Sequence, residues 1–368
     1  MNKKILKNIE WSILICVAIL IAIGCVALYS ATQNSEHDEL IKQLIWLSIS
    51  VPVLIAVIVI DYELIIKVAP IGYGIMLLLL VAVLFTKPIN GATSWFIIGS
   101  VSIQPAEFAK IFVVLTLALV ISKIQEKGKN EISNPLKLGL CLLVLAVPIL
   151  LIIKQPDYGT AIAFVIATLF MLLISGINKK YIFSALVLGV IIIPVMYFFI
   201  LPDHAKTRID VFLNPDLDPR GSGYNIIQSK LAIGSGQLFG MGVTQGNQTQ
   251  LGYLYPKTTD FIFSVIGEEM GFVIAGLVII LYVFLITKIV YVAKTAKDDK
   301  GSYIAIGIAG IFIFHMVENI GMTMGLLPIT GVPLPFVSYG GSSLLTNLIL
   351  IGLVLNIAGR RKKSLFIK

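Results

Sequence analysis

The sequence predicts an all-α, polytopic membrane protein, and two observations carry this prediction. Hydrophobic residues make up 57% of the 368 residues, charged residues only 13%, and the mean hydropathy is +0.95. So little polar surface cannot coat a soluble domain of this length. Apolar runs of about 20 residues recur along the chain, which is the length that crosses roughly 30 Å of hydrocarbon as a helix. The bilayer is therefore the expected solvent.

Ten such runs, bounded by charges and by proline or glycine, are the predicted spans of a single domain covering residues 1–368. They are residues 11–29, 41–60, 68–86, 106–122, 136–153, 159–176, 181–201, 260–290, 303–325 and 342–358. The first follows a lysine cluster, but no small-residue cleavage site comes after it, so we interpret it as an uncleaved helix. Cys16, Cys25 and Cys141 lie within apolar runs, where packing is expected instead of disulfides.

Lys and Arg gather on one side of the predicted membrane. The N-terminus, the connections on its side and the C-terminus carry 19 of them, whereas the other side carries 8. The positive-inside rule therefore places both termini in the cytoplasm. This distribution accounts for most of the net charge of +8 and leaves no compact basic domain for a nucleic-acid partner.

One long, Gly-rich extracytoplasmic loop, residues 202–258, joins the seventh and eighth spans and is not expected to be an independent domain. Loops of this length are usually functional or disordered. Tyr224, Ile227 and Leu231 recur at helical spacing, which predicts an amphipathic helix at the membrane surface. A solvated cap over the bundle is the alternative.

Three spans begin on the outer side with proline ahead of an acid. The stretches are "QPAEFAK" (104–110, with Glu107), "KQPDYGT" (154–160, with Asp157) and "PKTTDF" (256–261, with Asp260). Helix capping alone explains any one of them. Their clustering at one face, with Lys110 and Lys154, favours function, because charge in a membrane is costly. Glu107 and Lys110 are spaced i, i+3 and could form a functional pair or a structural clasp.

Of the three acids, only Asp260 both directly follows the long outer loop and lacks a basic residue one turn further on, and its nearest cation in the sequence is Lys257. An unpaired carboxylate at the hydrocarbon boundary is expected to have a raised pKa, which suits a general base. Glu268 and Glu269 lie two turns deeper and point in different directions. For Glu269 at least, helix packing or a polar contact with a neighbouring span is the expectation.

The last outer connection, residues 326–347, is rich in proline and glycine and uncharged. Non-helical backbone at membrane depth needs protein or a cavity to receive it. Gly340, Gly341, Ser342 and Ser343, with Ser338 just before them, could offer N–H groups and hydroxyls to an anion. A rigid re-entrant turn without a ligand is the equal alternative.

Taken together, five stretches resemble the SEDS family of bacterial cell-wall polymerases. They are "PLPFVSYGGSS" (333–343), "QPAEF" with "AK" (104–110), "KQPDYGT" (154–160), "GYNIIQSKLAIGSGQLFGMG" (223–242) and "TDFIFSVIGEEMG" (259–271). "LNPDLDPRGSGYN" and "TQGNQTQLGYLYPKTTDF" are more similar to the elongation members than to the division members. "GQLFGMG" departs from relatives, which more often have a third glycine there.

The resemblance implies a ten-span peptidoglycan glycosyltransferase in the bacterial cytoplasmic membrane. Its substrate would be lipid II, the undecaprenyl-pyrophosphate-linked disaccharide peptide, polymerised into glycan strands on the outer face during elongation. Its partners would be a class B penicillin-binding protein and other membrane proteins of the elongation complex. The family's essential aspartate maps onto Asp260, its paired Glu and Lys onto Glu107 and Lys110, and its second motif acid onto Asp157.

We expect Asp260 to remove the acceptor proton in an inverting transfer. The residues that could neutralise the departing pyrophosphate are Lys110, Lys42, Arg208 and Arg220. A divalent cation, Mg²⁺ or Mn²⁺, is left open, and no organic cofactor is expected. Asp157 is expected to brace Lys154 in preference to holding a metal.

Two alternatives remain at this stage, a flippase for a lipid-linked precursor and a scaffold for a partner enzyme. The clustering of the acids at one face, and the lack of two repeated halves with broken helices, weigh against the flippase.

Overall fold

The computed structural model describes residues 8–361, apart from residues 36, 89–91, 100, 201–202, 215–216 and 219–220. Each predicted span coincides with a helix: α2 (Trp11–Ala31), α3 (Asp38–Val59), α4 (Tyr62–Val83), α5 (Pro105–Gln125), α6 (Pro135–Ile153), α7 (Tyr158–Ile174), α8 (Lys179–Val195), α12 (Ile262–Lys294), α13 (Asp299–Thr323) and α14 (Gly341–Arg360). In the described part of the chain, eight of these are long and apolar enough to cross a membrane, and α7 is a shorter apolar helix. The all-α, multi-span architecture is confirmed.

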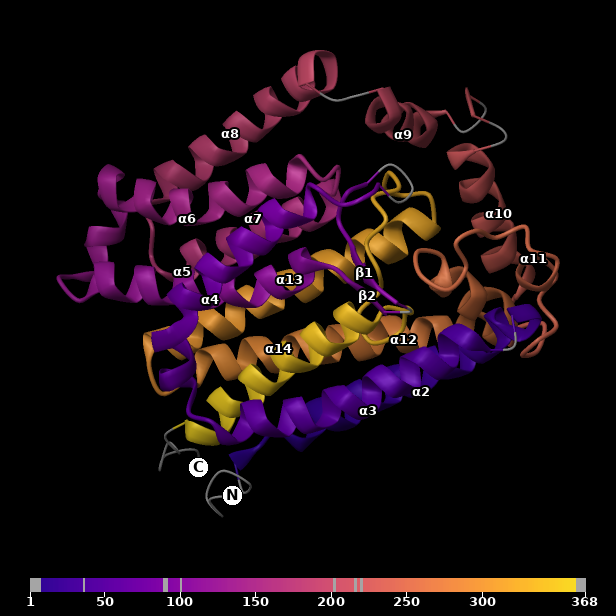
Figure 1. Cartoon of the computed structure of the whole chain (residues 1–368), viewed down its shortest axis with the longest axis horizontal. Coiled ribbons are helices and arrows are strands. Elements are labelled where there is room, and N and C mark those ends of the chain that lie inside the picture. The colour runs from indigo at the N-terminus through magenta and orange to yellow at the C-terminus, as the bar shows by residue number, and fades with distance from the viewer. Residues whose placement is uncertain are drawn as a thin grey trace.

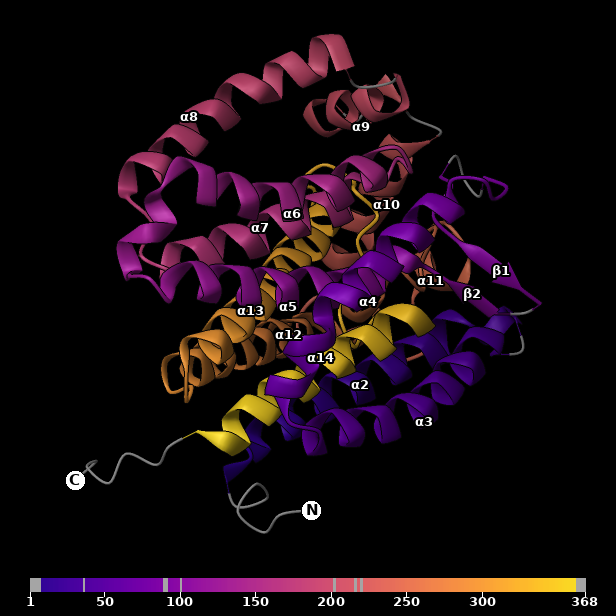
Figure 2. The same cartoon turned by 60° about the vertical axis from the view of Figure 1, so that its left-hand side comes forward.

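The helices form a bundle with α13 and α14 at its centre (Figure 1). Helix α13 packs against α5, α7 and α12, and α14 packs against α3 and α5. Helix α8 instead stands away from the bundle in both views (Figures 1 and 2), and none of its described side chains is buried. Arg361 forms an ion pair with Glu10 at 2.6 Å. The first and last spans therefore meet at one end of the bundle, here called the inner end, as an even number of crossings requires.

The connection between α4 and α5 contains a β-hairpin, which the all-α prediction missed. Strand β1 (Phe96–Ile98) pairs antiparallel with β2 (Val101–Ile103). The sequence "FIIGSVSI" carries the usual hairpin signal, two β-branched runs around a two-residue turn containing glycine. Gly99 has a φ of 63°, which glycine adopts without strain. Short 3₁₀ segments at Gln33–Ser35 (η1) and Lys129–Ser133 (η2) and a π-helical turn at Met196–Ile200 (η3) complete the connections.

The long loop carries three helices, α9 (Asp203–Leu213), α10 (Ser222–Ser235) and α11 (Asn247–Gln250). Helix α10 confirms the predicted helix within the loop. Its buried side chains are Ile226, Ser229 and Ala232, while Ile227 and Leu231 stay exposed. Helix α10 packs on α12, and the Ser229 hydroxyl bonds both the Ser264 hydroxyl and the Thr323 carbonyl at 2.6 Å. This part of the loop is docked on the bundle.

Helix α12 is broken at Gly271, whose φ of 76° and ψ of −178° are not helical. The loop segment 237–242 takes up the backbone groups that the break releases. Four hydrogen bonds join them: Met241 and Gly242 N–H to the carbonyls of Glu268 and Glu269 (2.9 and 3.0 Å), and Phe272 and Val273 N–H to those of Gln237 and Leu238 (2.8 and 3.1 Å). A Cβ at Gly240 would lie 2.2 Å from the Glu269 carbonyl oxygen, so the approach needs glycine there. The sequence had suggested no broken helix.

Candidate active site

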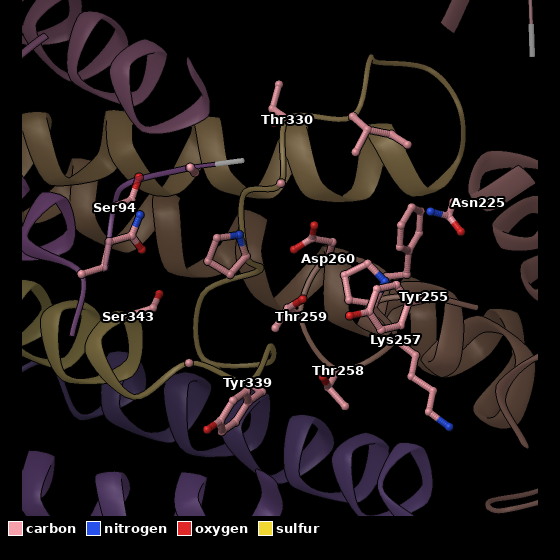
Figure 3. A pocket seen from close by; sticks show the side chains of 18 of the residues that line it. Ser94, Asn225, Tyr255, Lys257, Thr258, Thr259, Asp260, Thr330, Tyr339 and Ser343 are labelled. Atoms are coloured by element: carbon pink, nitrogen blue, oxygen red, sulfur yellow. The ribbon is translucent and has the colours of Figure 1, made fainter. Parts of the chain in front are cut away.

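A cavity of about 820 Å³ lies at the outer end of the bundle, opposite the meeting point of the first and last spans. Six of the predicted candidate residues line it: Glu107, Asp157, Arg208, Asp260, Gly340 and Ser343. Asp260 projects into its middle, with Ser94 and Ser343 on one side and Asn225 and Tyr255 on the other (Figure 3). Segments far apart in the chain therefore meet here through the ends of α2, α5, α7, α12 and α14.

Asp260 lies two residues before the first residue of α12, and its carboxylate does not cap that helix. The Thr259 hydroxyl is the side chain that hydrogen-bonds to it, and burial raises the pKa of Asp260, with Arg208 acting in the opposite direction. The half-buried carboxylate therefore faces the cavity without an ion pair within the described residues. Of the two roles that the sequence allowed for Asp260, this arrangement favours a general base over a helix N-cap.

The cation that acts on Asp260 is Arg208 of α9, not Lys257. The Arg208 guanidinium also donates to the Ile329 carbonyl at 3.4 Å. Lys257 donates to the Thr249 carbonyl at 2.9 Å, and burial lowers its pKa. Lys42 and Lys154 do not line the cavity. Arg220 lies outside the described residues.

The predicted Glu107–Lys110 pair is present, with 2.8 Å between Oε1 and Nζ and both side chains buried. Only Glu107 reaches the cavity, so Lys110 supports it from behind. The second partner of Lys110 is Nε2 of His315, at 3.3 Å. Since an ammonium only donates, Nε2 accepts, and the Nδ1 proton of His315 faces the Pro333 carbonyl at 3.1 Å.

Asp157 is the N-cap of α7 and accepts from the Thr160 N–H at 3.1 Å and from Gln104 Nε2 at 2.8 Å. Burial raises its pKa, and the negative charge of Glu107 adds to the rise. It forms no ion pair with Lys154, which is exposed, so the expected bracing of Lys154 is wrong. In the part of the chain that the structure describes, no three His, Cys, Asp or Glu side chains group as a metal site.

The turn before α14 is mostly committed to internal hydrogen bonds, as expected of a rigid re-entrant turn. Ser338 donates to the Thr259 carbonyl at 2.7 Å and accepts from the Leu334 N–H. The Gly340 N–H donates to Gln43 Oε1 at 3.1 Å. Gly341 packs on the Trp46 indole, and Ser342 accepts from the Gln104 N–H. Of this group only Gly340 and Ser343 line the cavity, so the structure does not bring Ser338, Gly341 or Ser342 to it.

Glu268 and Glu269 are buried and bind the long loop, so the expected contact of Glu269 with a neighbouring span is wrong. The Glu268 carboxylate accepts from the N–H groups of Gln248 (2.7 Å) and Thr249 (2.9 Å) and from the Thr249 hydroxyl. The Glu269 carboxylate accepts from the N–H groups of Thr244 (3.2 Å) and Gly246 (3.4 Å) and from Gln250 Nε2 (2.9 Å). Neutral donors, most of them backbone N–H groups, satisfy both carboxylates, which fixes the loop that leads to Asp260.

Three polar residues of α13 reach the site and were not singled out from the sequence: His315, Glu318 and Asn319. Glu318 Oε1 accepts from the hydroxyl of Thr330, which lines the cavity, at 2.7 Å. The available signal was their i, i+3 and i+4 spacing within an apolar span, because polar groups there usually face the interior.

The chain matches known proteins along most of its length. Residues 10–363 match the FtsW, RodA and SpoVE family, described as cell cycle proteins. The peptidoglycan glycosyltransferase MrdB of Escherichia coli K12 is 41% identical over 295 residues, covering 80% of this chain and 78% of MrdB.

Two solved structures share the fold. The crystal structure of the Thermus thermophilus rod shape determining protein RodA superposes with a TM-score of 0.73 at 27% identity, covering 97% of this chain and 98% of RodA. A chain of a peptidoglycan synthase complex that coordinates polymerization and crosslinking superposes with a TM-score of 0.80 at 27% identity, covering 95% of this chain and 97% of that one. Together with the family match, these likenesses show that the chain belongs to the FtsW, RodA and SpoVE family, the SEDS family of peptidoglycan glycosyltransferases.

Proposed function

We propose that the chain polymerises lipid II into glycan strands, with Asp260 as the general base. The observation that carries this proposal is the Asp260 carboxylate, which faces a cavity of about 820 Å³ and, among the described residues, neither caps α12 nor forms an ion pair. Burial keeps its pKa raised, which brings a carboxylate closer to the range that suits proton removal at neutral pH.

In the proposed step, Asp260 takes the proton of the 4-hydroxyl of an incoming lipid II. The hydroxyl oxygen forms the new bond to the anomeric carbon of the growing strand with inversion. The bond from that carbon to the pyrophosphate oxygen breaks, and its electrons leave with undecaprenyl pyrophosphate. Arg208 and Lys257 both line the cavity, and Lys257 already donates to the Thr249 carbonyl. We therefore assign the balancing of the leaving charge to Arg208, because Lys110 is buried behind Glu107.

Mg²⁺ or Mn²⁺ would supply further charge neutralisation if bound. The described residues do not form a complete metal site, so Asp157 or Glu107 would have to share such an ion with the substrate pyrophosphate.

We further propose ten spans with both termini in the cytoplasm, so that the cavity faces the outside of the cytoplasmic membrane. Helices α5 and α7 complete the count beside the eight helices that are long and apolar enough to cross a membrane. The excess of Lys and Arg at the end where α2 begins and α14 ends supports this orientation.

For partners, we propose a class B penicillin-binding protein within the elongation complex. The likeness to a chain from a synthase complex that coordinates polymerization and crosslinking supports a crosslinking partner. The 41% identity to MrdB over most of the chain supports the elongation branch.

The test is a polymerisation assay with purified full-length chain and lipid II, with and without the partner. Asp260→Asn is expected to lower the rate at least about 100-fold, the usual contribution of a general base. Asp299→Asn, an exposed acid at the start of α13 at the inner end, is the matched control and should polymerise like wild type. Polymer from Asp260→Asn at the wild-type rate would refute the base. Translocation of lipid II in vesicles without any polymer would favour the flippase.

A further inference from the structure

The two charged halves of the site come from different helices, and α13 packs against both of them. Asp260 precedes α12, whereas Glu107 and Lys110 lie on α5. The α13 residues Asn319 and His315, one turn apart, each contact one of these halves.

Asn319 is fully buried, and its Nδ2 donates to two backbone carbonyls. One is the carbonyl of Asp260, at 3.0 Å, and the other is that of Val332, at 2.9 Å. A side-chain amide nitrogen has two hydrogens, so both donors are used. A single side chain thus joins the backbone of the proposed base to the re-entrant loop.

His315 makes the corresponding connection to the other half. Its Nδ1 faces the Pro333 carbonyl, and its Nε2 accepts from Lys110, which in turn pairs with Glu107. Val332 and Pro333 are consecutive, and Pro333 lines the cavity. The adjacent carbonyls of these two residues therefore link Asp260 to the Glu107–Lys110 pair through α13.

We propose that Asn319 is a positioning residue for the reaction, and that it acts with His315 to hold Asp260 in register with Glu107. This inference rests on the proposed role of Asp260 as the base. Loss of the Asn319 donors would remove this hydrogen bond from the buried Val332 carbonyl and from the part-buried Asp260 carbonyl, and would let the Asp260 backbone move. A shift of about 1 Å in a reacting group can reduce the rate of an oriented reaction about 100-fold. We therefore expect the loss of Asn319 to lower the rate of the chemical step more than the binding of substrate.

The chain contains a matched control for this arrangement. Asn356 of α14 is also fully buried, and its Nδ2 also donates to two backbone carbonyls, those of Val57 and Ile60. Asn356 lies at the inner end of the bundle, whereas Asp260 lies at the outer end. The Asn356 Oδ1 also accepts from Arg360, so the two variants are compared by kcat and not by the thermal midpoint. A general effect of removing a buried, doubly donating amide should lower kcat at both positions.

The experiment compares Asn319→Asp with Asn356→Asp in the full-length chain with its partner, measuring kcat, KM for lipid II and the thermal midpoint. For Asn319→Asp, we expect kcat to fall about 10- to 100-fold while KM changes less than about twofold. For Asn356→Asp, kcat should stay within about twofold of wild type. Equal effects on kcat in the two variants, an unchanged kcat in Asn319→Asp, or a loss confined to KM would overturn the proposal.

If Asn319→Asp does not fold, two variants of His315 test the proposal instead. His315→Leu removes both contacts, whereas His315→Gln can accept from Lys110 and donate to Pro333. A lower kcat in the first that is restored in the second supports the proposal, and equal kcat values in the two refute it. Asp260→Asn is run alongside: if it is inactive while Asn319→Asp has full kcat, only the positioning role fails. If Asp260→Asn is fully active, the proposed function itself fails.

Discussion

The ion pairs among the described residues are concentrated at the inner end of the bundle and are scarce at the outer end. Six ion pairs occur within the described residues, and five of them lie at the inner end, including Arg361–Glu10 at 2.6 Å and Arg360–Asp61 at 3.4 Å. The sixth is Glu107–Lys110. Asp157 and Asp260, which face the cavity, accept hydrogen bonds from neutral groups instead. The ion pairs at the inner end connect the ends of helices, whereas Asp157 and Asp260 form no ion pair within the described residues, which leaves their carboxylates available to a substrate.

We expect the largest loss of stability when the ion pair at the outer end, Glu107–Lys110, is broken. Lys110→Met leaves the Glu107 carboxylate buried without its cation, which typically costs about 3–5 kcal/mol. We expect a large drop in the thermal midpoint in detergent, together with loss of polymerisation. Glu107→Gln with Lys110→Met, which removes both charges, should recover part of that midpoint. A double variant no more stable than Lys110→Met would show that the charge itself is not the cause.

The next effect concerns the two carboxylates that bind the loop. Glu268→Ala removes an acceptor shared by two N–H groups and a hydroxyl, and hydrogen bonds to a charged group contribute about 1.5–3 kcal/mol. We expect faster hydrogen–deuterium exchange across residues 244–250. Glu126→Ala, at an exposed position at the end of α5, is the control. Unchanged exchange in Glu268→Ala would mean that the loop is held by other contacts.

A smaller effect is the dependence of stability on pH. Burial raises the pKa of Asp260 in the folded state. In the unfolded chain the pKa of an aspartate is about 3.9, so the folded state binds the proton more tightly. The contribution of this group to stability is therefore fully present below that value and is lost as pH rises through the folded pKa. We expect the thermal midpoint of Asp260→Asn to exceed that of wild type at pH 7, by about 2–4 °C per kcal/mol, and the difference to close at acid pH. A midpoint below wild type at pH 7 would contradict this.

The smallest effect is expected for an exposed pair at the inner end. Lys297 and Glu63 are 3.0 Å apart with 44% and 45% of their side chains exposed, so water already solvates both. Lys297→Ala should leave the thermal midpoint and polymerisation unchanged within error. A drop comparable to that of Lys110→Met would erase the distinction between the two ends.

The spans and the three acids preceded by proline, Glu107, Asp157 and Asp260, could be predicted because each depends on a short local sequence pattern. Twenty apolar residues predict a span wherever they occur, and proline ahead of an acid marks the start of α5 and the N-cap of α7. The hairpin at 96–103 also has a local signal, two β-branched runs around a turn with glycine.

What could not be predicted depends on contacts between distant segments. Nothing near Asn319 in the sequence indicates that it donates to Asp260, 59 residues away. Likewise, the charge that lowers the pKa of Asp260 comes from Arg208 and not from Lys257, although Lys257 is nearer in the sequence. Lys257 donates to the Thr249 carbonyl instead. The roles of Glu268 and Glu269 were missed because their partners are backbone N–H groups, which no side-chain pattern reveals.

The break in α12 at Gly271 limits how this protein can be recombined with its relatives. The segment 237–242 and the broken turn complete each other's backbone hydrogen bonds, so neither is self-sufficient. A chimera that imports a relative's loop without the outer part of α12, residues 262–273, would combine two surfaces that were not selected together. The exchangeable module is therefore residues 236–273, with the cavity acid Asp260 inside it.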